Sequence, residues 1–192
     1  MEKKYNKIIL ITAPSGSGKT SIVKYLLRKF SRLSFSVSAT TRPPRDNEKN
    51  GVDYYFLTEN EFKEKIHQKE FLEWELVYEG KYYGTLKSEM ERIWQLQKVP
   101  VLDIDVQGAI HVQQQYPVNT MSIFIQAPSS EELKKRLLSR GSETEASLTA
   151  RINKSAYETT FKKHFDNVII NRHFEEACKE AEEIVSAFLA KE

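Results

Sequence analysis

Residues 8 to 20 read IILITAPSGSGKT, and this stretch decides the fold. The apolar run at 8–11 predicts a buried strand, and apolar residues at helical spacing up to Phe30 predict a helix after the loop. A glycine-rich loop in this position turns backbone N–H groups inward at a helix N-terminus, where they bind phosphate oxygens and the helix dipole favours negative charge. The order of strand, loop and helix therefore predicts a nucleotide triphosphate site.

Individual positions of the loop have separate predicted roles. Gly16 and Gly18 permit close approach to phosphate, Lys19 reaches the outer phosphates, and the Thr20 hydroxyl ligates a Mg²⁺ ion that bridges them. The motif normally begins with glycine, and Ala13 in that position costs backbone freedom if a positive φ is needed. An ordinary glycine-serine loop is the alternative, which the flanking strand and helix disfavour. The predicted ATP-binding residues of the loop are Ala13, Pro14, Ser15, Gly16, Ser17, Gly18, Lys19 and Thr20.

Composition excludes several classes of protein. A chain of 192 residues with 40% hydrophobic and 29% charged residues is typical of one soluble globular domain, with small lobes attached to it. The net charge of +2 gives no overall field for nucleic acid or membrane binding. We see neither the apolar core of a signal peptide nor a membrane-spanning run, and expect a cytoplasmic protein. Cys178 is the single cysteine, which excludes an intrachain disulfide, and it falls on the apolar stripe of the last helix. Whether the chain is a monomer or a homo-oligomer stays open.

The rest of the chain alternates between strand and helix patterns. Strands are expected at 35–39, 52–57, 71–78, 99–105, 121–125 and 167–170, and Thr58 with Glu61 forms a capping box for a short helix. The segment 38–85 is strand-rich and has the character of an inserted lobe. Elsewhere the alternation predicts an α/β fold, a parallel central sheet covered by helices on both faces. Ligands of such folds bind at the carboxyl ends of the strands.

Asp103 and Asp105 end the apolar strand predicted at 99–105. Strand alternation would point both carboxylates to the same side, and a carboxylate near the phosphate loop holds magnesium, here for Asp103 through a water. A solvated strand end is the alternative.

Planar guanidinium groups match phosphate oxygens two at a time, so arginines at five positions are candidates for phosphate binding: Arg42, Arg45, Arg136, Arg140 and Arg151. Arg136 and Arg140 can also be read as a solvated helix face, but the polar segment 141–145 beside them suits a lid.

A second binding site, for a monophosphate that accepts the transferred phosphoryl group, is predicted in the strand-rich lobe. Tyr54 and Tyr83, together with Arg42 and Arg45, supply hydroxyl and guanidinium groups for a monophosphate. A carboxylate there would accept from the N1–H and exocyclic amine of guanine and reject adenine, which has no donor at N1. Packing is the alternative role for the tyrosines. The lobe and the nearby strand end offer four candidate groups for a base: Ser38, Glu73, Thr85 and Asp105.

With these residues assembled, the chain resembles the guanylate kinase family over essentially its whole length. The matching stretches are APSGSGKT at 13–20, SVSATTRPPR at 36–45, NGVDYYF at 50–56, FLEWE at 71–75, YYGT at 82–85, LDIDVQG at 102–108 and KKRLLSRGSETE at 134–145. The resemblance implies a three-layer P-loop kinase fold in three parts. These are a core (1–37, 86–135 and 152–192), a GMP-binding lobe (38–85) and a small helical lid (136–151).

The resemblance also implies roles for individual residues. Guanine would be read by Ser38, Glu73, Thr85 and Asp105, and the GMP phosphate would be held by Arg42, Arg45, Tyr54 and Tyr83. The catalytic cations would be Lys19, Arg42, Arg136, Arg140 and Arg151, and Asn171 would lie by the adenine of ATP. Two positions depart from the family pattern: Ala13, and Asn47 where glycine is usual.

The predicted reaction is Mg²⁺-dependent transfer of phosphate from ATP to GMP, and to dGMP, by direct in-line displacement without a covalent intermediate. The acceptor phosphate is already ionised at neutral pH, so no general base is needed. One alternative is a catalytically inactive, guanylate-kinase-like protein-binding module, which Lys19 and Thr20 disfavour. The other is a kinase for another nucleoside monophosphate, which Glu73 disfavours.

Overall fold

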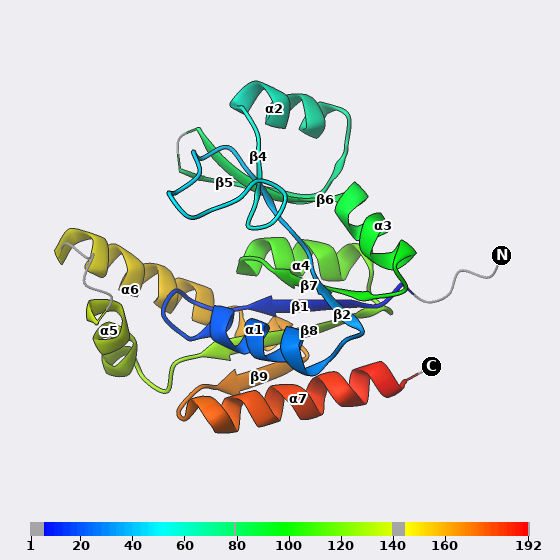
Figure 1. Ribbon diagram of the computed structural model, residues 1–192. Coiled ribbons are helices and arrows are strands. Elements are labelled where there is room, and N and C mark those ends of the chain that lie inside the picture. Colours follow the sequence, from blue (N-terminus) through cyan, green and yellow to red (C-terminus); the bar gives the residue numbers. More distant parts are fainter. Residues whose placement is uncertain (1–5, 79, 140–144, 192) are drawn as a thin grey trace.

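The structure is a computed structural model that describes residues 6–78, 80–139 and 145–191. Its centre is a parallel sheet of five strands in the order β2-β7-β1-β8-β9 (Figure 1). The strands, in that order, are Leu33–Phe35, Val99–Asp103, Ile8–Thr12, Thr120–Gln126 and Asn167–Ile170. Strand β1, which leads into the phosphate loop, thus lies at the centre of the sheet with β7 on one side.

Helices cover both faces of this sheet. The side chains of β1 alternate, so Ile9 and Ile11 pack in one core with α1 (Lys19–Lys29) and α7 (Phe174–Ala190). Ile8 and Leu10 pack in the opposite core with α3 (Lys87–Gln95) and α4 (Val106–Gln115). Figure 1 shows α4 and α7 on opposite sides of β1. The three-layer α/β fold predicted from the sequence is therefore confirmed, and Cys178 is buried on the α7 face as expected.

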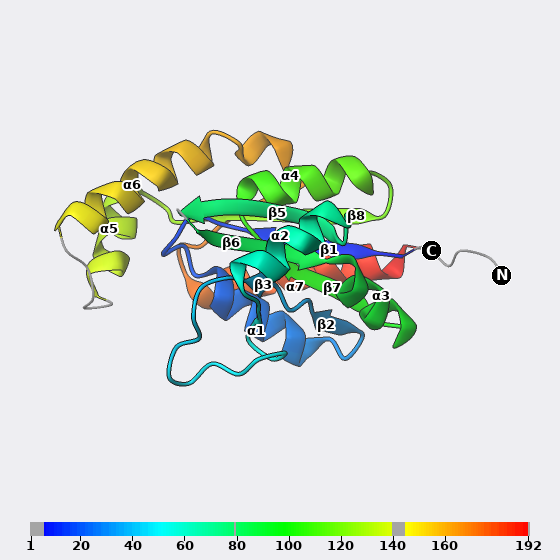
Figure 2. The same ribbon diagram turned by 90° about the horizontal axis from the view of Figure 1, so that it is seen from above.

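A second, smaller sheet forms the lobe. Its order is β4-β3-β6-β5, with strands Tyr55–Phe56, Ala39–Thr40, Lys81–Leu86 and Phe71–Tyr78. Helix α2 (Glu59–His67) packs on it through Phe62, whose ring lies 4.2 Å from that of Phe71. The predicted capping box of Thr58 and Glu61 begins this helix. Figure 2 shows the lobe from above, lying over the central sheet.

The strand predicted at 35–39 is wrong as a single element. Strand β2 ends at Phe35 in the central sheet, and β3 begins at Ala39 in the lobe. The crossing segment is held by Glu89 of α3, whose carboxylate accepts from Val37 N (3.0 Å) and the Tyr55 hydroxyl (2.9 Å). The predicted strand at 52–57 is also shorter, and β7 ends at Asp103 rather than at residue 105. Alternating polarity marks an extended chain but does not say which sheet it joins.

Helices α5 (Ser130–Leu138) and α6 (Glu145–Thr159) form an arm at one end of the central sheet, on the left in Figure 1. Ser129 caps α5 through Glu132 N. Leu133 and Leu137 pack against Leu148 of α6. A short 3-10 helix, Lys162–His164, leads from α6 toward β9. Among the described residues, no helix is long and apolar enough to cross a membrane.

Candidate nucleotide site

The phosphate loop joins β1 to α1 with two glycines in the left-handed region, Gly16 at φ 90° and Gly18 at φ 93°. Both conformations would strain a residue with a side chain. Ala13 is buried, and the described non-glycine residues with positive φ are Lys69 and Gln97. Ala13 therefore needs no left-handed backbone, and alanine there costs no strain.

Asn171 holds the loop from beneath. It is 4% exposed, and its side-chain amide donates to Ser17 O at 2.8 Å. A Cβ at Gly18 would overlap with the same amide nitrogen. Arg136 donates to the backbone oxygen of Asn171 at 3.0 Å and to Glu132 at 3.0 Å. Asn171 is thus tied to the loop and Arg136 to Asn171, and neither lines the cavity that the loop faces.

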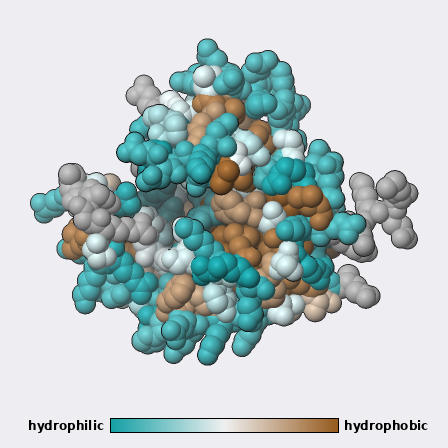
Figure 3. All heavy atoms as spheres, viewed as in Figure 1, coloured by the Kyte–Doolittle hydropathy of each residue, from teal (hydrophilic) through white to brown (hydrophobic). Residues whose placement is uncertain are grey.

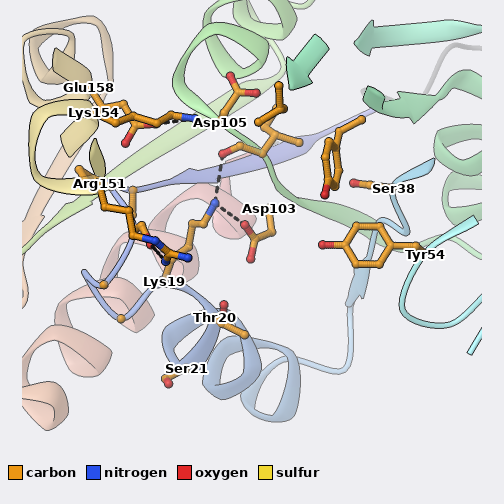
Figure 4. A pocket seen from close by; sticks show the side chains of 18 of the residues that line it. Lys19, Thr20, Ser21, Ser38, Tyr54, Asp103, Asp105, Arg151, Lys154 and Glu158 are labelled. Carbon is orange, nitrogen blue, oxygen red and sulfur yellow. Dashed lines mark hydrogen bonds and ion pairs between the residues drawn. The ribbon is translucent and has the colours of Figure 1, made fainter. Parts of the chain in front are cut away.

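That cavity has a volume of about 530 Å³ and extends from the loop to the lobe. Figure 3 shows the hollow beneath the lobe, and Figure 4 shows the cavity from close by. Of the predicted site residues, it brings together Ala13, Pro14, Ser15, Gly16, Gly18, Lys19, Thr20, Ser38, Tyr54, Glu73, Tyr83, Asp103, Asp105 and Arg151. Those outside its lining are Ser17, Arg42, Arg45, Thr85, Arg136 and Asn171. Arg140 lies outside the described residues.

At the loop end of the cavity, Lys19 extends to the tip of the neighbouring strand. Its ammonium forms an ion pair with Asp103 and donates to Ile104 O at 3.2 Å (Figure 4). Arg151 of α6 reaches across to the Ser15 hydroxyl at 3.1 Å. Thr20 lies on the first turn of α1 and lines the same space. Two cations, two hydroxyls and a carboxylate therefore line one region beside the loop.

At the lobe end, Glu73 is 6% exposed and faces Thr85 on the adjacent strand. The Thr85 hydroxyl donates to Glu73 Oε1 at 2.6 Å. Burial and the nearby charge of Asp105 raise the pKa of Glu73 to about 7, although the hydrogen bond from Thr85 acts in the opposite direction. The pairing of the two strands thus holds a carboxyl group with a raised pKa in the cavity wall.

Asp105 reaches the cavity in a different way from the one predicted. It lies beyond β7 and caps α4, accepting from Gly108 N at 2.9 Å. The prediction that strand alternation aligns it with Asp103 is therefore wrong, although both line the cavity. Glu75 was missed by the sequence analysis. Its pKa is held well above the ordinary value because its carboxyl shares a hydrogen bond with that of Asp105 and is partly buried.

Arg42 lies beside the cavity and is engaged by Glu48, which was also missed. Its two terminal nitrogens each donate to a Glu48 oxygen at 2.6 Å, and its guanidinium lies 4.8 Å from the centre of the Tyr54 ring. The backbone of Arg45 donates to Glu48 at 2.9 Å, while the Arg45 side chain is exposed. The hydrogen bonds from Arg42 and Arg45 lower the pKa of Glu48 to about 2. An acid three residues after Arg45 was the available sequence signal.

Helix α6 contributes two further residues that the sequence analysis missed. Lys154 and Glu158 line the cavity together with Arg151. The Lys154 ammonium lies 3.8 Å from the Glu158 carboxylate. The spacing of three and then four residues places all three on one face of a helix, and this signal was available in the sequence. Burial raises the pKa of Glu158. The remaining unpredicted lining residues are Ser21, Phe35, Asp53, Val77, Gly84 and Ile104.

The parallel sheet, the left-handed glycines and a lysine that reaches the adjacent strand end define a P-loop nucleotide-binding protein of the kinase type. The guanylate kinase family model matches residues 5–188, so the chain belongs to the guanylate kinase family. The guanylate kinase of Bacteroides thetaiotaomicron is 47% identical over 186 residues, which cover 97% of this chain and 91% of that protein.

Further relatives agree with this assignment. The guanylate kinase of Thermotoga maritima is 43% identical and covers 96% of this chain, which spans 88% of that protein. The crystal structure of guanylate kinase from Anaplasma phagocytophilum superposes with a TM-score of 0.76 at 30% identity, covering 98% of this chain and 89% of that one.

Proposed function

We propose that this chain transfers the terminal phosphoryl group of ATP to GMP, giving ADP and GDP by direct in-line displacement. One observation carries this proposal: a single cavity joins the phosphate loop and Lys19 to the buried carboxyl of Glu73. The first group of residues suits a nucleoside triphosphate, and the second suits a base that presents hydrogen-bond donors. A donor and an acceptor nucleotide then face each other across the cavity.

At the ATP end, the loop N–H groups and Lys19 bind the outer phosphates, with Arg151 beside them. Lys19 would exchange Asp103 for phosphate oxygen, since its ammonium already pairs with an anion beside the loop. Arg136 and Arg140 of the lid are further cations for the phosphates. Asn171 would lie by the adenine of ATP and orients the loop through its contact with Ser17. Because phosphoryl transfer spreads negative charge over the moving group, these cations stabilise the transition state.

The cofactor proposed with ATP is Mg²⁺. The Thr20 hydroxyl and the Asp103 carboxylate are the hard oxygen donors that magnesium prefers, and Asp103 would act through a water. The described residues contain no group of three or more acidic, histidine or cysteine ligands for a metal. This donor set fits an ion that takes its other ligands from phosphate and water, and that neutralises phosphate charge when bound.

At the GMP end, ionised Glu73 accepts from the N1–H and the exocyclic amine of guanine. Adenine presents an acceptor at N1 and leaves the buried carboxylate unpaired, which is costly. Thr85 fixes the carboxylate, and Ser38 and Asp105 complete the base site. The tyrosine hydroxyls of Tyr54 and Tyr83 bind the GMP phosphate together with Arg42 and Arg45. The proposed division is a core, a GMP-binding lobe at 38–85 and a lid at 136–151.

A coupled assay of ADP formation with Mg²⁺ and ATP tests the proposal. GMP, dGMP, AMP, CMP and UMP are offered in parallel, and we expect turnover with GMP and dGMP to exceed the others by at least about a hundredfold. Preference for another monophosphate would refute the assignment of Glu73. Protein that is folded but inert toward all five would instead support the protein-binding module.

A further inference from the structure

Gly108 occupies the third position of α4 and is buried. Its backbone is helical, since the described glycines with positive φ are Gly16, Gly18, Gly51 and Gly80. Glycine is the least favourable residue in a helix after proline, and alanine is the most favourable. The backbone therefore does not require glycine here. A residue that breaks a local rule in this way points to a requirement elsewhere.

That requirement is space for Glu73. A Cβ at Gly108 would lie 2.7 Å from Glu73 Oε2, 3.2 Å from its Cδ and 3.6 Å from its Cγ. The Glu73 side chain packs directly on the helix backbone, at a distance that any side chain would prevent. Its other oxygen is held at 2.6 Å by Thr85 on the opposite side. The carboxylate is therefore fixed between β6 and the first turn of α4.

The same glycine also fixes the second carboxylate of the base site. Gly108 N donates to Asp105 Oδ1 at 2.9 Å, so the N–H of this residue orients Asp105 while its Cα supports Glu73. Two side chains, one from β5 and one from the N-cap of α4, are thus positioned against one residue. Their relative placement follows the backbone of α4.

We propose that Gly108 is a positioning residue for guanine recognition, because its missing side chain allows Glu73 to lie where it can meet the base. This inference rests on the proposed function. A methyl group at 108 would displace the end of a flexible side chain rather than backbone, so the fold tolerates it. The carboxylate that reads guanine then moves by several tenths of an ångström, and misplacement on this scale is costly at a binding site.

The test is Gly108→Ala, with Gln107→Ala as the matched control. Gln107 is exposed on the same turn of α4, so its change alters helix propensity without approaching Glu73. For Gly108→Ala we expect GMP KM and calorimetric Kd to rise by about ten- to a hundredfold. ATP KM should stay within about twofold, and the GMP-to-AMP activity ratio should fall. An unchanged GMP Kd, or an equal loss of ATP and GMP affinity, would overturn the inference.

A second pair of variants separates positioning from damage to the helix. In the Glu73→Ala background the added methyl meets no carboxylate, so Gly108→Ala should change GMP Kd by less than about twofold. The same loss in both backgrounds would overturn the inference. If Gly108→Ala alone failed to fold, folding of the double variant would still locate the conflict at Glu73, and failure of both would refute it. Failure of the proposed function is a distinct result, in which the unmodified protein neither binds nor phosphorylates GMP.

Discussion

Replacing Glu73 with Gln should make the protein more stable and a poorer enzyme at the same time. The change keeps the shape of the side chain and its contact with Thr85 but removes the charge. Glu73 is buried, and its burial and the charge of Asp105 raise its pKa from 4.5 to about 7. The folded protein therefore holds this proton more tightly than the unfolded chain. Ionisation of Glu73 works against folding.

The magnitude and its pH dependence follow from the difference between these two pKa values. Below the ordinary pKa of 4.5 the carboxyl is protonated in both states, so there is no penalty. The penalty grows as the pH rises toward about 7 and is constant above it, and each pH unit in that interval adds about 1.4 kcal/mol. The glutamine variant should therefore gain about 1 kcal/mol at about pH 5.5 and about 3 kcal/mol at about pH 8. For a chain of this size, the larger gain raises Tm by roughly 6–12 °C.

Function should change in the opposite direction. A carboxylate offers acceptors to both guanine donors, whereas the glutamine amide offers a single acceptor and a donor that faces another donor. Losing a charged hydrogen bond costs about 1.5–3 kcal/mol, so GMP KM should rise by roughly ten- to a hundredfold. Thermal unfolding at both pH values, with GMP and ATP kinetics, tests both effects. The exposed Glu91→Gln is the control. A Tm that does not rise at the higher pH would refute the desolvation argument, and an unchanged GMP KM would refute base reading by Glu73.

Three further outcomes are expected. Lys19→Met should leave a folded protein that turns over at no more than about a thousandth of the normal rate, and near-normal turnover would remove Lys19 from the mechanism. Glu48→Gln should raise GMP KM about tenfold and leave ATP KM unchanged, because the Arg42 guanidinium loses the carboxylate that orients it; a lower GMP KM would mean that Glu48 competes with the phosphate. GMP KM should fall as pH rises from about 6 to 8, because Glu73 must lose its proton to accept from guanine, and this dependence should disappear in Glu73→Gln; a profile shared by both proteins would contradict the assignment.

The sequence predicted the parts of the site that are built from local structure. The phosphate loop could be read because glycine, lysine and threonine at fixed spacing directly follow a buried strand. The capping box at Thr58 was equally local, and it is present. Glu73 and Thr85 could be identified only as candidate polar groups, because their direct hydrogen bond depends on how β5 pairs with β6. The role of these two residues in reading the base came from the family resemblance, because the register of β5 and β6 could not be derived from the sequence.

What the sequence did not predict depends on tertiary contacts. The segment 36–38 passes between two sheets and is placed by contacts with distant residues, among them Glu89. Asp105 has strand-like spacing from Asp103 but begins a helix. The pairing of Arg42 with Glu48 spans an irregular loop, which has no period from which contacts can be inferred. In each case the residue type was visible in the sequence, and its partner was not.

The two ends of the cavity explain why selectivity among nucleoside monophosphates should depend on the base rather than on the phosphate. Lys19 and Arg42, both proposed to bind phosphate, are paired with Asp103 and Glu48. Because every nucleoside monophosphate presents the same phosphate group to these cations, the free energy of that contact is similar for all of them. Glu73 differs because burial disfavours its charge and Thr85 satisfies one of its oxygens. A base with two adjacent donors hydrogen-bonds the carboxylate and so offsets the free-energy cost of its burial. A base with an acceptor at the same place leaves the carboxylate unpaired and increases that cost. The selectivity for guanine is therefore expected to depend on the buried carboxylate and on the helix turn that positions it.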